Sequence, residues 1–393
     1  MPLKRACRKA GPLLVCAASP SRIKISMPSS SPAKARHPAA VKSPTASETK
    51  AVQEIDALFQ AAGLVRNLRG KSAGVTRRVR MKRVAPEELS RPEPVPFIAP
   101  NGVQLLKIPA WNNPGRQNAD WLWHGFSTRK GGLSHAYSAE GAPGELNLGF
   151  TAVDDRETVV RNRRLLVEAV SGDPSTPLVT LRQIHSSVLV LWAPADAYRQ
   201  SPCKGDGLMT AQTGILIGVQ PADCIPVLVA DRKRRVVAAF HAGWRGTVKR
   251  IVESGVGRMR LEFGSHPEDL IAAIGPGIGP CCYAVGEEVL SSFESQFTYA
   301  DELFHEVYDT DPVRTKYPML FLTQRAPGHS NIGPSLHVDL IEANRRQLLA
   351  AGLKPRSIQV SGACTNCHPE LFFSHRAAHG HAGRMMSVIG IRP

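Results

Sequence analysis

The sequence contains no run that approaches the roughly 20 consecutive apolar residues of a membrane-spanning helix. It also lacks the dense cysteine framework of a secreted domain, since eight cysteines are spread over 393 residues and follow no such pattern. A multicopper oxidase needs several His-x-His pairs and a His-Cys-His element, whereas this chain has one pair, His379 and His381, and no His-Cys-His. We therefore expect free thiols in a reducing compartment, no membrane association, and no copper-dependent oxidation of phenols.

Acidic residues are absent from residues 1–47, which are rich in Ser, Ala, Pro, Lys and Arg and contain no apolar core of signal-peptide length. This composition is typical of an organellar transit peptide. We predict that residues 1–50 are a disordered leader addressed to an organelle, a plastid rather than a mitochondrion. The alternative is a disordered basic tail on a cytoplasmic protein. Residues 51–95 are predicted to be a basic linker, with one possible amphipathic helix at 51–70 followed by a solvated connector at 76–83.

The formal net charge of +16 is concentrated at the N-terminus. Residues 1–95 hold 19 of the 49 basic residues and 6 of the 33 acidic ones, so residues 96–393 carry only +3. A protein that follows a phosphate backbone needs a basic face on its folded part. The charge distribution therefore argues against nucleic acid as a partner.

The part of the chain beyond the leader has the pattern of a folded α+β protein. Hydrophobic residues make up 42% of the chain and charged residues 21%, which allows a substantial core. Short strands alternate with amphipathic helices, one of which should start at Asp154 and Asp155 and end at Gly172, and another of which should stop at Gly352. We predict one domain of mixed β-sheets layered with helices over residues 96–393. The long Gly/Pro-rich loop within residues 301–336 is expected to interrupt it.

Residues 220–247 hold the densest chemistry in the chain. Two apolar runs, 224–230 and 236–241, flank the charged turn DRKRR, which predicts an antiparallel strand pair. Cys224 opens the first run and His241 closes the second, so the pairing should bring thiolate and imidazole to one edge of a sheet. Gly243 then leads into a helical pattern, whose first amides could bind an anion. A third candidate ligand, His185, lies in the middle of a predicted β segment at 179–192.

The motifs RQIHSS, GDGLMT, PADCIPVL, HAGWRGT, IGPGIGPCCY and the final FFSHR…GR occur in one order over roughly residues 123–391. On these motifs the chain resembles the YfiH-like laccase-domain family of purine nucleoside phosphorylases, long labelled multicopper polyphenol oxidases. The resemblance implies a zinc ion held by His185, Cys224 and His241, with copper the less suitable metal. It also implies phosphorolysis of adenosine, inosine, guanosine and methylthioadenosine, together with deamination of adenosine. The expected partners are thus purine nucleosides and phosphate.

The same resemblance implies roles for further residues. The matching positions place Arg129 and Asn147 in the substrate pocket and Asp206 near the active centre. From the residues themselves we predict Cys224 and Arg245, with Asp206, to be catalytic, and Gln183, Gly243 and Arg384 to bind substrate or phosphate. Arg376 is a further candidate cation of the pocket. One departure is visible, because the family usually has Tyr-Glu-Val where this chain has Tyr283, Ala284 and Val285, and Glu287 follows two residues later.

Two chemistries fit such a site. Three protein ligands leave one position of a tetrahedral zinc open, where water becomes acidic enough to attack C6 of adenine at neutral pH. Phosphate, held by arginine, could instead attack C1′ of the sugar while an acid such as Asp206 helps the purine depart. Two other classes stay open: a metal-independent hydrolase with Cys224 as nucleophile, and a non-catalytic interaction module with a vestigial metal site.

The sequence Cys364-Thr-Asn-Cys367-His368 matches the spacing CxxCH of covalent haem attachment. A lone five-residue match is a weak signal, and the chain offers no separate axial-ligand module. As half of a second zinc site, the two cysteines would need another pair of ligands, and no pair in the sequence has the usual spacing. We therefore predict neither covalent haem nor a second metal.

Overall fold

The computed structural model of the chain describes residues 81–89, 93–111, 119–194, 196, 202–307 and 335–393. Within these residues no helix is long and apolar enough to cross a membrane. The predicted leader, the possible helix at 51–70 and the Gly/Pro-rich loop lie wholly or mostly outside the described residues, so they stay predictions.

The sheet that carries the 220–247 stretch has six strands in the order β15-β12-β10-β11-β8-β7. Its central strands β10 and β11 are buried along their whole length, because both faces of the sheet are covered. Such strands are near-continuous apolar runs, as observed here. The bounds are β7 Leu189–Leu191, β8 Gly207–Thr210, β10 Ile225–Asp231, β11 Val236–Ala242, β12 Leu270–Ile274 and β15 Ile358–Val360.

A second six-stranded sheet has the order β2-β3-β4-β16-β9-β6. The C-terminal strand β16 lies in its middle, antiparallel to both β4 and β9. The last strand of the chain thus lies inside a sheet and not at its edge. The bounds are β2 Phe97–Ile98, β3 Gln104–Leu106, β4 Leu122–Ser127, β6 Leu178–Thr180, β9 Ile215–Val219 and β16 Ser387–Ile391, with the short β5 Lys130–Ser134 following β4.

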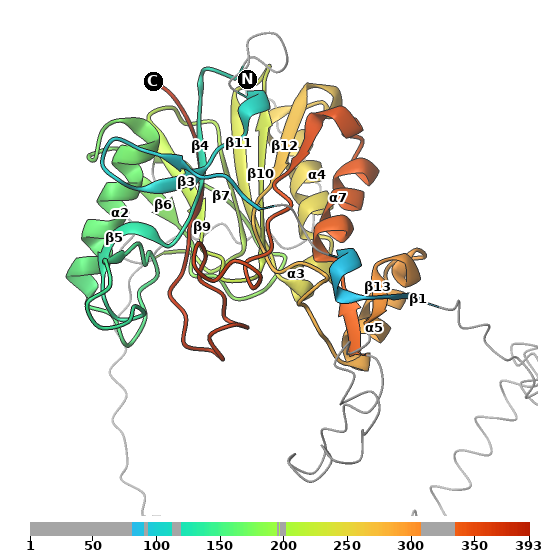
Figure 1. Cartoon of the computed structure of the whole chain (residues 1–393). Coiled ribbons are helices and arrows are strands. Elements are labelled where there is room, and N and C mark those ends of the chain that lie inside the picture. Colours follow the sequence, from blue (N-terminus) through green and yellow to red (C-terminus); the bar gives the residue numbers. More distant parts are fainter. Residues whose placement is uncertain (1–80, 90–92, 112–118, 195, 197–201, 308–334) are drawn as a thin grey trace, which may run out of the picture. The chain divides into compact units, whose positions relative to one another are not determined.

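The two large sheets pack face to face, and helices cover their outer faces (Figure 1). Between the sheets, one apolar core joins residues such as Leu228 and Val237 of the first sheet to Phe126 and Ile217 of the second. The far face of the first sheet packs against α4 and α7, and the far face of the second packs against α2. The helices are α2 Arg156–Ser171, α3 Trp244–Val248, α4 Ile251–Phe263, α5 Glu287–Glu294 and α7 Leu340–Ala350. The predicted layered α+β fold is confirmed.

Capping residues explain where two of these helices begin and end. Asp155 accepts a hydrogen bond from the Thr158 amide at the start of α2, and Gly172 follows the end of that helix with φ 86°. Asp339 caps α7 in the same way through the Glu342 amide. Short acceptor side chains satisfy amides that the first helical turn leaves unpaired, and glycine adopts the left-handed conformation at no steric cost. Gly352, with φ 96°, terminates the segment of α7 as predicted.

A third, three-stranded sheet has the order β1-β13-β14, with β1 Lys82–Val84, β13 Phe304–Val307 and β14 Ser335–Val338. Strand β1 pairs in parallel with β13. Lys82 and Arg83, at the end of the segment predicted to be a solvated connector, are therefore part of a sheet. The charged composition of that segment conceals the pairing, because a backbone ladder does not depend on side-chain polarity.

Two local predictions are wrong in an instructive way. Residues 179–192 do not form one β segment, because β6 and β7 belong to different sheets and His185 lies in the connection between them. The helical pattern after Gly243 is broken into α3 and α4 at Arg250, whose φ is 56°. In both places a residue with positive φ, His185 or Arg250, lies where the regular element is interrupted.

Candidate metal centre and substrate cavity

His185, Cys224 and His241 come together at one edge of the first sheet, and we call them the His/Cys triad. Their ligand atoms all lie within 4.8 Å of one another. The antiparallel register pairs Pro226 with His241. Cys224 directly precedes the first residue of β10 and therefore lies beside His241. The rings of His185 and His241 meet edge to face with 5.0 Å between their centroids. The predicted convergence of thiolate and imidazole at one sheet edge is therefore present.

His185 reaches the triad from a loop whose backbone is held by a single carboxylate. Asp206 is fully buried and accepts hydrogen bonds from the amides of residues 184, 185 and 186 at 3.2, 3.0 and 2.7 Å. The hydroxyl of Ser186 adds a fourth bond at 2.7 Å. His185 itself has φ 55°, a conformation that a non-glycine residue adopts only where its surroundings enforce it. The hydrogen bonds to Asp206 hold His185 in this conformation.

The same carboxylate orients His241. Oδ1 of Asp206 lies 2.9 Å from Nδ1 of His241, so the other ring nitrogen, Nε2, is left to face Cys224 and His185. Hydrogen bonding of this kind fixes the tautomer of a metal-binding imidazole. Although burial alone would raise the pKa of Asp206, its bonds from His241 and Ser186 lower it to about 2. Asp206 is thus an ionised acceptor behind the triad rather than an acid that faces a substrate.

The ionisation of the triad favours metal binding. Burial would raise the pKa of the Cys224 thiol, but the neighbouring His241 and His185 outweigh burial and lower that pKa to about 6. Burial would lower the pKa of His241, but Cys224 and Asp206 raise it to about 9. Near pH 7 the metal-free site therefore holds a thiolate beside an imidazolium. A metal ion would replace the proton of that imidazolium, and two imidazoles with a thiolate are a donor set that suits zinc.

The shifted pKa of Cys224 leads to a first prediction, on alkylation of the metal-free protein by iodoacetamide. A lowered pKa means that the thiolate is present above about pH 6 and is lost as the pH falls through that value. The rate at Cys224 should therefore already be near its plateau at pH 7.5 and fall about tenfold per unit below pH 6. Peptide mass spectrometry gives the rate at Cys224 itself, with Cys203 of the same chain as the reference thiol. A midpoint at pH 8 to 9 would contradict the paired state.

Gly243 allows the helix α3 to start against the triad. A Cβ atom at this position would lie 2.9 Å from the sulfur of Cys224 and 3.3 Å from the ring of His185. Only glycine leaves room for both ligands at the N-cap of α3. The predicted role of its amides in anion binding is weakened, because α3 has five residues and not the long helix that the pattern suggested. What α3 brings to the site are the side chains of Trp244 and Arg245.

A cavity of about 750 Å³ opens above the triad. This volume lies within the range of small-molecule sites and can accept a nucleoside. All three triad residues line it, together with aromatic and polar side chains that include Phe150, Tyr283 and His375. Five arginines line it, while one acidic residue, Asp223, is among the described lining residues. The arginines are Arg163, Arg182, Arg245, Arg376 and Arg384.

The predicted binding residues divide into those at the cavity and those behind it. Gln183, Arg245 and Arg384 line the cavity. Arg129 does not: its guanidinium pairs with Glu145 at 2.7 Å, donates to the carbonyls of Tyr137 and Pro369, and stacks on a ring. The prediction that Arg129 binds substrate or phosphate therefore does not fit the structure, since its charge is paired within the fold.

Asn147 and Asp206 also lie outside the cavity wall. Asn147 is fully buried, and its amide oxygen accepts hydrogen bonds from the Gly149 and Arg384 amides. It therefore holds the backbone of Arg384, whose side chain reaches the cavity, instead of contacting a substrate. Glu287, which follows the Tyr283-Ala284 departure, is exposed at the start of α5 and does not line the cavity.

Several cavity residues were not predicted as site residues, above all Tyr283, His375, Arg163 and Arg182. Burial and the nearby Cys224 raise the pKa of Tyr283 to about 12, so its phenol stays protonated beside the triad. Arg376 donates to the carbonyl of Ala284 at 3.0 Å and stacks over the Tyr283 ring at 5.3 Å. The backbone carbonyl of Ala284 is thus a hydrogen-bond partner of a cavity arginine. The CCY, FFSHR and RQIHSS motifs, which contain Tyr283, His375 and Arg182 respectively, were the available signals, whereas Arg163 lies in none of the quoted motifs.

The chain is similar to several known proteins. A family model described as multi-copper polyphenol oxidoreductase laccase matches residues 123–392. A purine nucleoside phosphorylase of Bacteroides thetaiotaomicron is 34% identical over 276 residues, which cover 68% of this chain and 91% of that protein. The adenosine deaminase RL5, from an unknown prokaryotic organism, is 32% identical and covers 67% of this chain and 92% of its own. The crystal structure of YlmD from Geobacillus stearothermophilus superposes with a TM-score of 0.60 at 30% identity, over 77% of this chain and all of that one.

Proposed function

The chain belongs to the family described as multi-copper polyphenol oxidoreductase laccase, and on that premise we propose that it is a zinc-dependent purine nucleoside phosphorylase that also deaminates adenosine. One observation carries the proposal. A single cavity of nucleoside size combines the His/Cys triad with five arginine side chains. Phosphorolysis needs an anion site beside the sugar, and deamination needs an activated water beside the base. The cavity offers residues for both.

The His/Cys triad would hold the zinc ion. Two imidazoles and a thiolate leave one of four tetrahedral positions for a small ligand, and zinc there acts as a Lewis acid that makes water more acidic. His241 is kept in one tautomer by Asp206, and Cys224 is already ionised near neutral pH. The protein thus presents the donors in the state that binding requires.

The arginines supply the phosphate site. Arg245 is the best placed, because its α3 lies directly beside the triad and no carboxylate of the described residues forms an ion pair with it. Its guanidinium stacks on the Trp244 ring at 4.5 Å, which limits its motion. Guanidinium groups bind phosphate by two parallel charge-assisted hydrogen bonds. The phenol of Tyr283, protonated at neutral pH, is a hydrogen-bond donor at the same wall.

Replacing Arg245 by Ala should separate the two reactions. We expect kcat/KM for phosphate-dependent cleavage to fall roughly 10- to 100-fold, because the anion loses a charge-assisted contact of about 1.5–3 kcal/mol. Deamination, which uses water, should change by less than about threefold. The measurement pairs hypoxanthine or adenine release with phosphate and inosine formation without it.

The matched control is Arg129→Ala, which removes an arginine outside the cavity. Breaking its partly buried pair with Glu145 should cost on the order of 3 kcal/mol of stability and lower both activities in parallel. Equal losses of both reactions in Arg245→Ala would contradict a phosphate role for this residue.

Two alternatives make different predictions. If Cys224 is the nucleophile of a metal-independent hydrolase, chelation of the metal leaves activity intact while alkylation of the thiol abolishes it. If the domain is a non-catalytic interaction module, no base is released from any nucleoside.

A blue-copper site would add a methionine to two histidines and a cysteine, and no methionine is among the described residues that line the cavity. Zinc is therefore the better metal for this donor set.

The finer parts of the proposal rest on the resemblance. We propose adenosine, inosine, guanosine and methylthioadenosine as substrates, to be compared by kcat/KM on the purified protein.

We also propose that the leader directs the protein to a plastid. Imaging a fusion of residues 1–95 to a fluorescent protein tests that destination, with cytoplasmic fluorescence as the contradicting result.

A further inference from the structure

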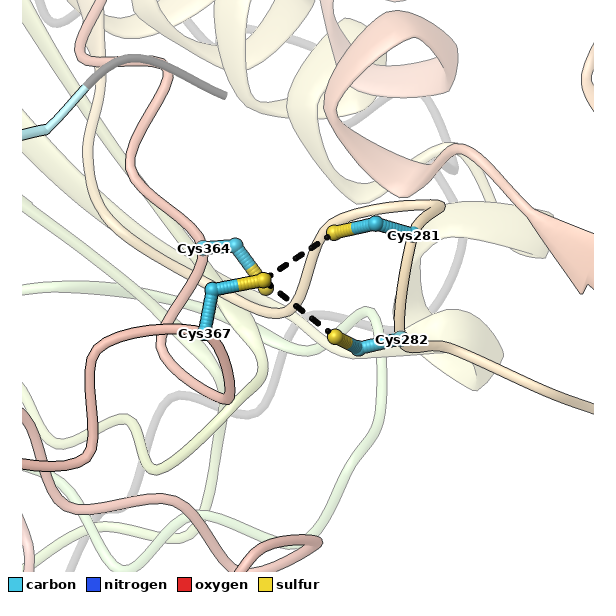
Figure 2. A group of neighbouring side chains, drawn as sticks. All are labelled: Cys281, Cys282, Cys364 and Cys367. Atoms are coloured by element: carbon cyan, nitrogen blue, oxygen red, sulfur yellow. Dashed lines mark hydrogen bonds between the residues drawn. The ribbon is translucent and has the colours of Figure 1, made fainter. Parts of the chain in front are cut away.

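Four cysteines outside the cavity meet at one point of the fold. Cys281, Cys282, Cys364 and Cys367, which we call the cysteine cluster, have all their sulfur atoms within 4.8 Å of one another. In Figure 2 the four side chains converge from two loops, and Cys367 contacts Cys281 at 3.5 Å and Cys282 at 3.4 Å. None of the four lines the substrate cavity. The prediction that the Cys364-Cys367 pair has no partner pair is therefore wrong.

The backbone conformation of the two loops brings the four thiols together. Residues 279–282 form a turn in which the Cys282 amide donates to the Gly279 carbonyl at 3.0 Å, and both adjacent thiols face the other loop (Figure 2). The Gly279 amide donates to the sulfur of Cys364 at 3.2 Å, which favours a thiolate there. A Cβ atom at Gly279 would lie 3.2 Å from the sulfur of Cys281 and 3.3 Å from Cβ of Cys364. Glycine is what permits the two loops to approach this closely.

The distances fit one ion with four sulfur ligands. Zn–S bonds of about 2.3 Å place the sulfurs of a tetrahedral site about 3.8 Å apart. Iron–sulfur clusters attach each cysteine to a multinuclear core and spread the sulfurs more widely. A disulfide is also a poor description, because Cys367 lies equally near two thiols and nothing singles out a partner. Cys364 is fully buried and Cys281 and Cys282 are partly buried, so four thiolates there need a cation to offset their repulsion.

We propose that Cys281, Cys282, Cys364 and Cys367 bind a structural zinc ion, separate from the His/Cys triad. The four protein ligands complete a tetrahedron and leave no open position, which is the arrangement of structural and not catalytic zinc. Binding converts up to four thiols to thiolates and releases their protons.

The zinc joins two loops that form the cavity wall. Tyr283 directly follows Cys282, and Arg376 lies in the loop that continues from Cys367. The two loops are already bonded near the cluster, since the Thr365 amide donates to the Gly277 carbonyl at 3.0 Å. Asp223, beside Cys224, accepts bonds from both the Thr365 hydroxyl and the Arg376 amide at 2.7 Å. The cysteine cluster is thus placed to hold Tyr283 and Arg376 against the triad.

The experiment counts zinc in the full-length chain with the triad disabled. In a His185→Ala background, protein purified under reducing conditions should retain one zinc ion per chain by plasma mass spectrometry. Adding Cys282→Ser and Cys367→Ser should remove it, and adding Cys203→Ser, outside the cluster, should not. This count does not depend on the activity of the enzyme, so it can fail or succeed independently of the proposed function.

A second measurement covers the case in which the cluster variants do not fold. Cobalt added to the metal-depleted His185→Ala protein, whose cluster is intact, should give the intense visible bands of a tetrahedral cobalt tetrathiolate together with thiolate charge-transfer absorption in the near ultraviolet. Zinc should then displace the cobalt and bleach the bands.

Three results would overturn the proposal. One is a folded His185→Ala protein that holds no zinc and gives no cobalt bands. Another is iron with acid-labile sulfide at the cluster. The third is a peptide in which Cys367 is disulfide-bonded to Cys281 or Cys282 in the reduced, zinc-supplemented protein.

Discussion

Replacing any one member of the His/Cys triad by Ala should abolish phosphorolysis and deamination together. In the proposed function both reactions depend on one metal ion, whose Lewis acidity would contribute several kcal/mol, so each activity should fall at least about 1000-fold. Each variant should also lose one zinc ion per chain relative to the unaltered protein, because two remaining ligands bind weakly. Zinc content, purine release with phosphate and inosine formation are measured on the same preparations.

The control for these variants is Cys203→Ala, which removes a cysteine that belongs neither to the His/Cys triad nor to the cysteine cluster. It should keep full zinc content and full activity. If Cys224→Ala keeps its zinc and its activity while the two histidine variants do not, Cys224 is only a partly buried thiol and the three-residue site is wrong. Activity that survives complete removal of metal would favour the cysteine-hydrolase alternative.

Replacing Asp206 by Asn should weaken the metal site without touching a ligand. The carboxylate accepts five hydrogen bonds, from residues 184 to 186 and from His241, and a neutral amide presents one acceptor oxygen and an opposing NH₂. Loss of the partner that orients a metal-binding histidine typically costs 10- to 100-fold in metal affinity. Leaving buried amides unpaired should also lower the free energy of unfolding by roughly 3 kcal/mol. Competition with a zinc chelator and denaturant titration measure the two effects.

Asp231→Asn is the matched control for that variant. Asp231 is likewise fully buried and accepts two backbone amide bonds, but it lies at the opposite end of β10 from Cys224. It should lower stability without changing zinc affinity. Equal zinc affinity in Asp206→Asn and the unaltered chain would show that His241 does not need its carboxylate partner.

The lowered pKa of Asp206 predicts how the free energy of unfolding depends on pH in the acidic range. A pKa lowered to about 2 means that the folded state binds its proton less readily than the unfolded chain. The stability that Asp206 contributes is therefore present above about pH 4 and is lost as the pH falls towards 2. In Asp206→Asn the fall of stability over this range should be shallower.

Much of the local structure was predictable because its cause is local. The strand pair around DRKRR follows from two apolar runs and a charged turn, and the start of α2 follows from Asp155 and its reach to the Thr158 amide. These signals depend on neighbours within a few residues, so no knowledge of the fold was necessary.

Other features depend on residues that are distant in sequence. Arg129 was expected at the pocket, but a fold that brings Glu145 and Pro369 to its guanidinium satisfies the charge elsewhere. Asp206 looked like a turn residue or an acid, and only its burial behind His241 shows that it positions ligands. No pattern in residues 281–282 and 364–367 reveals that they meet.

Composition and short motifs were sufficient for the fold class, the family and the choice of His185, Cys224 and His241, because hydrophobic periodicity and ligand chemistry are carried by the residues themselves. Tertiary structure alone decided which arginines face the cavity and that a second set of four thiols converges. These outcomes follow from sheet packing that brings together segments more than 80 residues apart, such as Cys281 and Cys367. Such contacts are selected by the free energy of the whole core, to which the residues that meet contribute only a small part.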